Sequence, residues 1–119
     1  MTIGKDKHQI SLDKIDCGKD VSVSIYGGDK PHIGAVAVAV PRESLSGDGS
    51  ISSSASVICI AGHKEDELAR KVALKISAAW NCVVSVSVGI HIDDACLDDF
   101  VHIEQNVETL VSELLAERG

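Results

Sequence analysis

Three histidines flank apolar runs that are typical of strands, and strand ends often carry ligand-binding groups. His32 precedes an Ala- and Val-rich run, His63 lies in CIAGHKED after another run, and His91 lies near the end of VSVGIHIDDA. If neighbouring strands bring these ends to one edge of a sheet, the imidazoles and the carboxylate of Asp93 or Asp94 surround one pocket. Imidazoles can hydrogen-bond a phosphate or a ring edge, and with a carboxylate they can bind zinc or another divalent ion.

Each histidine also has an interpretation that needs no ligand. His63 can serve as a polar residue at a helix entry, and His32 follows a glycine-rich turn that is explained by chain reversal alone. His91 is expected to share its strand face with two serines and a glycine, which leave room for a flat ligand or a partner backbone. The metal alternative stays open here, although no histidine spacing is typical of a metal site.

Two glycine-containing segments are candidates for anion binding. The turn at 27–30 (GGDK) and the junction at 62–64 (GHK) can present backbone amides to a phosphate, since glycine permits close approach and a helix start carries partial positive charge. Neither segment matches a P-loop or a dinucleotide fingerprint, and Glu65 and Asp66 would repel an anion at the helix start. Phosphate binding therefore rests on the glycines alone.

Motifs for nucleophilic catalysis are missing from the sequence. There is no G-x-S-x-G elbow and no H-E-x-x-H pair, and the four cysteines form no C-x-x-C motif. Reduced thiols are expected, and Cys59 and Cys82 lie in apolar runs where a thiol usually packs as a small hydrophobic group. The sequence favours a binding protein over an enzyme.

Hydrophobic periodicity predicts the elements that must position these groups. Alternation in VSVSIY places Val21, Val23 and Ile25 on one strand face, and apolar residues recur at helical spacing in two later segments. The predicted fold is α+β, a mainly antiparallel sheet of about five strands with two helices packed on one face. The predicted strands cover 8–15, 21–26, 33–40, 54–61 and 82–92, and the predicted helices cover 64–80 and 98–117.

Length, composition and charge limit the classes of function. The 119 residues predict a single domain, 1–119, because domains commonly contain ~100–150 residues. A net charge of −7 without a basic stripe argues against nucleic-acid binding. No apolar run reaches the ~20 residues of a membrane span and no signal segment is evident, so a cytoplasmic protein without membrane contact is expected.

Small side chains on the predicted strands indicate that something covers the second sheet face. Ala35, Ala37, Ser85 and Ser87 are expected on that face, with valines beside them. An extended apolar sheet face seldom stays exposed, so we expect a homo-oligomer or a ligand against it.

Three segments together resemble a known family. In this order, YGGDKPHIGAVAVAV, AGHKEDELAR and VSVGIHIDDA are similar to the prenylated flavin chaperone family, the small accessory subunits of gallate-type nonoxidative decarboxylases, and the resemblance spans roughly Val21 to Leu97. It implies a protein that carries prenylated flavin mononucleotide (FMN) for a nonoxidative aromatic-acid decarboxylase and is not itself the decarboxylase. The scarcity of aromatic residues, 3% of the chain, departs from the many flavin sites that stack the ring on an aromatic side chain.

These observations lead to one main hypothesis and two alternatives. The main hypothesis is a cofactor-binding chaperone for prenylated FMN or FMN, with a decarboxylase as partner protein. The alternatives are a metal-binding protein or metal-dependent enzyme that uses the clustered histidines, and a purely structural oligomeric protein. The predicted cofactor-binding residues are Gly27, Gly28, His32, Gly34, His63, His91 and Asp93.

Overall fold

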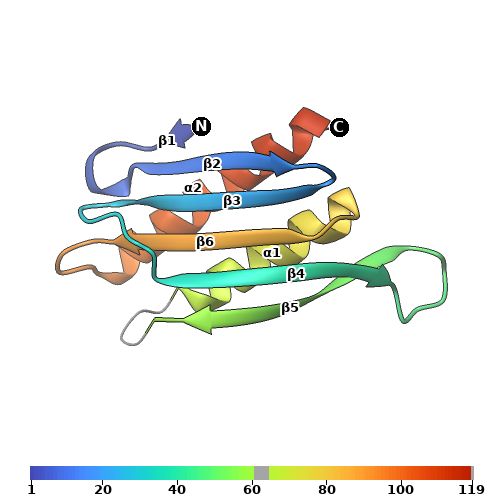
Figure 1. The fold of residues 1–119 in the computed structure, drawn as a ribbon. Helices are drawn as coiled ribbons and strands as arrows, with labels where there is room; N and C mark the ends of the chain where they lie inside the picture. Colours follow the sequence, from blue (N-terminus) through green and yellow to red (C-terminus); the bar gives the residue numbers. More distant parts are fainter. Residues whose placement is uncertain (61–64, 119) are drawn as a thin grey trace.

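The computed structural model describes residues 1–60 and 65–118. In this part of the chain, six strands form one sheet in the order β1-β2-β3-β6-β4-β5 (Figure 1). The elements in chain order are β1 (Thr2–Ile3), a short 3-10 helix η1 (Asp6–His8), β2 (Ile10–Cys17), β3 (Asp20–Gly28), β4 (Ala35–Glu43), β5 (Ile51–Cys59), α1 (Asp66–Trp80), β6 (Val84–His91) and α2 (Leu97–Arg118).

The α+β class with two helices is confirmed, but the expected mainly antiparallel sheet of about five strands is wrong in its number of strands and in the direction of one pairing. The described sheet has six strands and is mixed, because β6 pairs in parallel with β3 and antiparallel with β4. The chain reaches β6 only after α1 has crossed the sheet, and such a crossover brings a strand back in the direction of an earlier one. The extra strand is β1, two residues that pair with β2.

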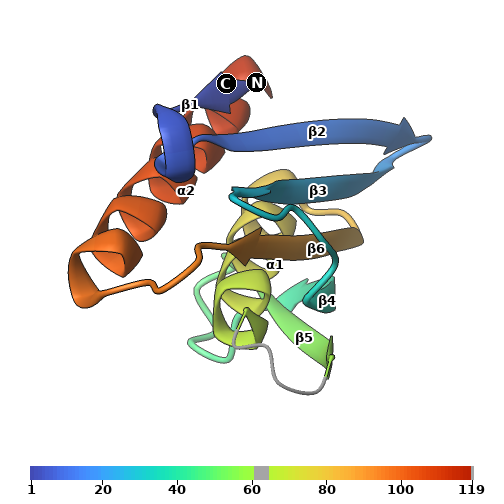
Figure 2. The same cartoon turned by 90° about the vertical axis from the view of Figure 1, so that its left-hand side faces the viewer.

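Both helices lie on the same side of the sheet, as Figure 2 shows. The residues that alternate inward on β3 and β6 are buried beneath them, including Val23, Ile25, Val86 and Val88. Helix α2 contributes Val107, Leu110 and Leu114 to the same core, at the spacing of one helical stripe. Among the described residues, no helix combines the length and the apolar composition needed to cross a membrane.

The small residues of β4 face the helices and not the open side of the sheet. Ala35, Ala37 and Ala39 are fully buried, and α1 packs across β4. The expectation that Ala35 and Ala37 lie on the second face is therefore wrong, because the alanines make room for a helix backbone. Cys82 is buried as expected, whereas Cys59 is exposed, since it ends the edge strand β5.

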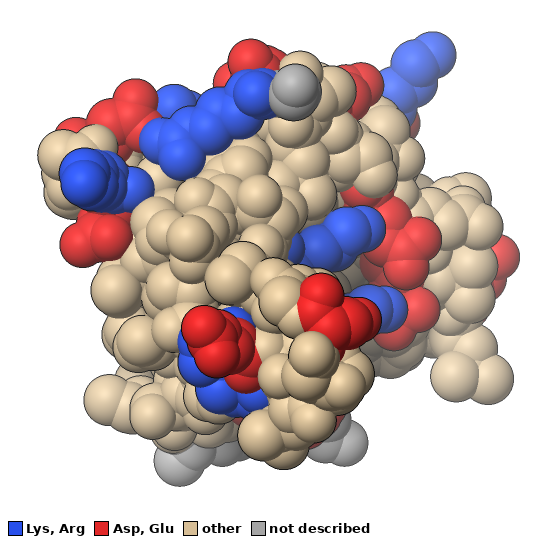
Figure 3. All heavy atoms as spheres, turned by 90° about the vertical axis from the view of Figure 1, so that its right-hand side faces the viewer, with Lys and Arg blue, Asp and Glu red and all other residues tan. Residues whose placement is uncertain are grey.

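The sheet face opposite the helices, which we call the open face, carries the other residues of each strand. Cross-strand partners share a face, and the register aligns Asp13, Ser24, Ser87, Val36 and Ile58 in one row across five strands. Figure 3 views the molecule from the end where β4 leads into β5 and shows a broad area without charged side chains between clusters of Lys, Arg, Asp and Glu. The open face itself is rich in serine and valine.

Candidate functional site

The end of β6, the loop between β3 and β4, and the start of α1 meet at one edge of the sheet. His91 is the last residue of β6, His32 lies in the β3–β4 loop, and Glu65 directly precedes α1. The two imidazole rings approach edge to face, with centroids 6.5 Å apart. The structure thus brings together His32 and His91, two of the predicted site residues, while His63 lies outside the described residues. We refer to Lys30, His32, Glu65, His91 and Asp93 as the rim cluster.

His32 is held between a backbone carbonyl and a carboxylate. Its Nδ1 lies 3.0 Å from the carbonyl oxygen of Lys30, which can only accept, so Nδ1 carries a hydrogen. Its Nε2 lies 3.1 Å from Glu65 Oε1, and both side chains are mostly buried, at 22% and 12% exposed. This second contact joins the β3–β4 loop to the start of α1.

His91 and Asp93 form the second half of the rim cluster. His91 Nε2 lies 3.0 Å from Asp93 Oδ1, and Lys30 Nζ lies 3.3 Å from the same oxygen. The hydrogen bond from His91, and after it the one from Lys30, lowers the pKa of the Asp93 carboxyl. The Asp93 amide donates to the Asp29 carboxylate over 3.0 Å, so the β3–β4 loop also fixes the segment that follows β6.

Gly27 and Gly28 allow close backbone approach, Gly34 leaves room for the Glu65 carboxylate, and the amides of Gly28 and Gly34 are already paired. Gly28 has φ +78°, and a Cβ there would overlap the carbonyl oxygen of His91. The amides of Gly28, Asp29 and Lys30 donate to protein carbonyls at 3.1, 2.6 and 3.2 Å, and the Gly34 amide donates to Val88 at 2.9 Å. The turn at 27–30 therefore offers no row of open amides to a phosphate, and any ligand contacts here come from side chains.

Gly89 is a site-forming residue that sequence analysis treated only as small. A Cβ at Gly89 would overlap the carbonyl oxygen of His32 and would lie 2.9 Å from the Ile33 nitrogen. The β3–β4 loop crosses the sheet directly over this glycine, and that crossing places the His32 ring near His91. Glu65 was also missed, because it was interpreted as a first-turn acidic residue and nothing in the sequence pairs it with His32.

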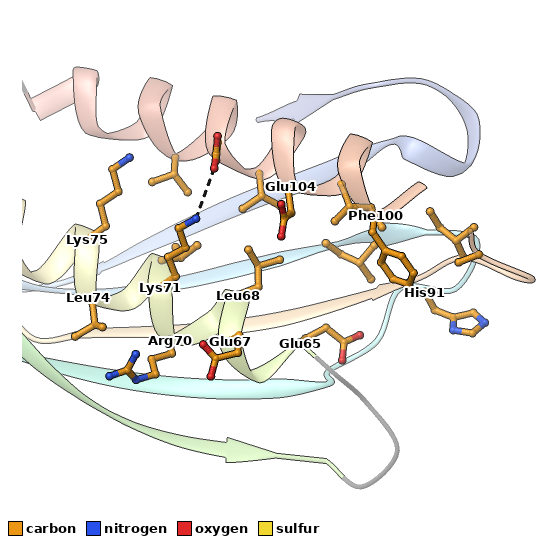
Figure 4. A pocket seen from close by; sticks show the side chains of 18 of the residues that line it. Glu65, Glu67, Leu68, Arg70, Lys71, Leu74, Lys75, His91, Phe100 and Glu104 are labelled. Atoms are coloured by element: carbon orange, nitrogen blue, oxygen red, sulfur yellow. Dashed lines mark ion pairs between the residues drawn. The ribbon is translucent and has the colours of Figure 1, made fainter. Parts of the chain in front are cut away.

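A groove with a volume of about 860 Å³ opens between α1, α2 and β6, and Glu65 and His91 of the rim cluster lie at one end of it. His32 instead lines a smaller hollow beside the β3–β4 loop. Figure 4 shows the groove with His91 and Phe100 at that end and Lys71 reaching across toward α2. Lys71 Nζ lies 3.6 Å from Glu108 Oε1. The apolar walls are formed by Leu68, Val72, Ile90, Ile92, Phe100, Ile103, Val107 and Val111.

The groove also carries both signs of charge near its mouth. Arg70, Lys71 and Lys75 come from α1. Glu65 and Glu67 lie at the start of α1, and Asp94, Glu104 and Glu108 come from the β6–α2 segment and α2. A flat apolar ring system with an anionic tail fits such a site, because the ring gains apolar contacts and the tail can pair with the lysines.

The metal alternative finds no support in the described residues. Across 1–60 and 65–118, no group of three or more His, Cys, Asp or Glu side chains is arranged to hold a metal ion. The two described histidines of the rim cluster each face a carboxylate as hydrogen-bond partners.

Comparison with known families gives an independent result. No curated protein matches the chain. Residues 4–118 match the family described as prenylated flavin chaperone LpdD-like domain, and this range includes every element from η1 to α2. The match covers nearly the whole chain and agrees with the resemblance seen in the segments around His32 and His91. The chain belongs to the prenylated flavin chaperone LpdD-like family.

Proposed function

We propose that this protein binds prenylated FMN in the groove between α1 and α2 and delivers it to a nonoxidative aromatic-acid decarboxylase, without catalysing the decarboxylation itself. The observation that supports this function best is a groove of about 860 Å³ with apolar walls that ends at Glu65 and His91, in a member of a prenylated flavin chaperone family. Cofactor and drug-sized sites commonly measure about 300–1,000 Å³ and combine apolar walls with a few polar groups.

The ring system lies against the apolar walls formed by Leu68, Ile103 and Val107, and its polar edge faces the rim cluster. His91 can hydrogen-bond carbonyl or ring nitrogen atoms of the flavin edge through the ring nitrogen that does not contact Asp93, and Asp93 keeps His91 oriented. His32 contacts the Lys30 carbonyl and Glu65, and so positions the loop beside His91. The phosphate lies toward Lys71 and Lys75, away from the carboxylates of the rim cluster. The cofactor supplies its chemistry only on the enzyme that receives it.

The predicted site residues keep distinct roles in this proposal. Gly27 and Gly28 allow the close backbone packing that positions the loop, and Gly34 leaves room for the Glu65 carboxylate. His91 contacts the ligand, Asp93 orients His91, and His32 positions the loop beside them. His63 remains part of the proposed site, although it lies outside the described residues.

The test is anaerobic titration of the purified protein with FMN and with prenylated FMN, followed by absorbance and fluorescence. The parent protein should bind the prenylated form at micromolar concentration. Because hydrogen bonds to charged groups contribute about 1.5–3 kcal/mol, His91→Ala and Lys75→Ala should each weaken binding about ten- to a hundredfold. His102→Ala and Lys19→Ala are matched controls, since neither residue lines the groove.

The same titration separates the proposal from a purely structural role. If the protein only docks on a partner, it should bind no flavin, and the histidine substitutions should have no effect. If neither flavin binds at about 10 μM, a concentration that corresponds to a weak complex, the proposed function is wrong. If His32→Ala and His91→Ala bind as well as the parent, the site assignment is wrong.

A further inference from the structure

The open face combines a flat polar centre with exposed apolar side chains. Ser85 Oγ donates to Ser22 Oγ over 3.2 Å, and Ser87 Oγ donates to Ser24 Oγ over 3.1 Å, so the central hydroxyls already bond to each other. Around them Ile15, Val38 and Val40 are 66%, 41% and 50% exposed. Each pair thus makes within the sheet a hydrogen bond that does not depend on water, which lowers the cost of covering these hydroxyls.

One corner of the open face contains an acidic hollow. This hollow of about 410 Å³ lies where the β3–β4 loop overhangs the sheet, and its lining includes Asp13, Tyr26, Ile15, Pro31 and Ile33. Asp13 is exposed, and its Oδ2 accepts a hydrogen bond of 2.5 Å from the Tyr26 hydroxyl. Apolar walls around a carboxylate suit an arginine side chain, whose stem packs on the walls while its guanidinium pairs with the carboxylate.

The opposite corner of the open face presents an arginine. Arg42 is exposed on β4, on the same face as Val36, Val38 and Val40, and its Nε donates to Ser54 Oγ over 2.9 Å. The row of Asp13 reaches β4 at Val36, six residues before Arg42. At ~3.3 Å per residue and ~4.8 Å per strand, the two residues are separated by about 20 Å along the strands and about 14 Å across them.

We propose that the open face is the surface through which two copies of this chain associate, with Arg42 of each copy entering the Asp13 hollow of the other. A two-fold axis makes every contact occur twice, so an acidic hollow and an exposed arginine on one face complement themselves. The midpoint between Asp13 and Arg42 falls beside Ser22 and Ser85, at the centre of the face. The two-fold axis therefore lies between the two facing sheets and passes close to the Ser22–Ser85 pair.

This arrangement also covers the exposed apolar side chains. Rotation about that axis brings Val38 of one copy near Val38 of the other. It also places Val40 of one copy over the row of Ser24 and Ser87 in the other copy. The strands of the two sheets then cross at a large angle, which is one of the two common ways for sheets to pack face to face. The helix groove lies on the opposite side of the sheet and stays open.

Charge reversal tests the pairing directly. Sedimentation should show the parent as a dimer at about 10 μM, and Asp13→Arg and Arg42→Asp should each weaken association at least tenfold, because like charges across an interface cost several kcal/mol. The double variant Asp13→Arg/Arg42→Asp restores opposite charges at both symmetric contacts and should recover the dimer. Circular dichroism and thermal melts establish that each variant is folded.

Several outcomes would overturn the proposal. A parent that stays monomeric up to about 100 μM, far above the range of a specific dimer, would leave the open face to a partner of another kind. Single variants that remain dimeric, or a folded double variant that stays monomeric, would refute the Asp13–Arg42 contact. As a second probe of the same face, Val38→Lys should also produce a monomer, whereas Lys71→Glu in the helix groove should not change the oligomeric state.

Discussion

Replacing Gly89 by alanine is predicted to displace the β3–β4 loop and with it the histidine that the loop positions. The backbone conformation at Gly89 suits any residue, since its φ is not in the left-handed region, so the whole effect comes from contact. The added methyl group would overlap the His32 carbonyl oxygen, which is part of the backbone and cannot rotate away. To reach an ordinary carbon–oxygen separation of about 3.5 Å, the loop must move by more than 1 Å.

That movement weakens a defined set of contacts. His32 N donates to Gly89 O over 3.4 Å, Gly34 N donates to Val88 O over 2.9 Å, and His32 Nε2 contacts Glu65 over 3.1 Å. Backbone hydrogen bonds contribute about 0.5–1.5 kcal/mol each, and overpacking costs about 1–3 kcal/mol. Alanine recovers about 0.5–1 kcal/mol relative to glycine within a strand. The free energy of unfolding should therefore fall by about 2–4 kcal/mol.

Urea unfolding followed by the fluorescence of Trp80, the single tryptophan, measures this change. Trp80 lies under the Arg118 guanidinium, 4.2 Å from the ring centroid, and reports the packing of α1 against α2. The midpoint should fall with an unchanged m value. Ser85→Ala, on the same face of β6, is the control and should cost no more than about 1 kcal/mol, the net value of one hydrogen bond.

The flavin titration should show a second effect, because Gly89→Ala moves His32 away from Glu65 and His91. If Gly89→Ala unfolds within about 0.5 kcal/mol of the parent, which is the range of neutral surface substitutions, the loop does not press on Gly89 and the reasoning is refuted. A destabilised variant that still binds flavin as the parent does would separate His32 from the binding site.

Two further predictions concern ionisable groups away from the groove. Hydrogen bonds from the Cys96 amide, and to a smaller extent from His8 and Lys7, hold the pKa of Asp99 well below its usual range. The ionised carboxylate therefore contributes stability above about pH 4, and this contribution is lost as the pH falls. The urea midpoint of the parent should decrease below pH 4 and that of Asp99→Asn should decrease less; an equal decrease in both proteins would contradict this. The hydrogen bond to Asp13 raises the pKa of Tyr26, the single tyrosine, so its ultraviolet titration should shift to lower pH in Asp13→Asn, and an unchanged midpoint would show that this bond does not form in solution.

The candidate site shows how far residue patterns reach. His32 and His91 were predicted to meet because both stand at strand ends, and their rings approach within 6.5 Å. Glu65 and Gly89 were not predicted as partners of His32, because a carboxylate at a helix start and a glycine in a strand each have a sufficient local explanation. The groove was also not predicted, since the apolar stripes of the two helices were assigned to the core. Whether two stripes close on each other or stay apart depends on how the helices lie on the sheet.

The sequence by itself determined the element types and the inward positions. Period-two alternation in β3 and β6 and helical spacing in α2 are local signals that follow from backbone geometry, and Val23, Val86 and Leu110 are buried as the patterns require. Only the tertiary structure decided the strand order, the parallel pairing of β3 with β6, and the face of β4 that meets α1. Those features depend on which strand β6 joins after α1 crosses the sheet. Since β4 is apolar on both faces, its side-chain pattern fits either orientation, and the choice follows from the close approach that alanine allows to a helix.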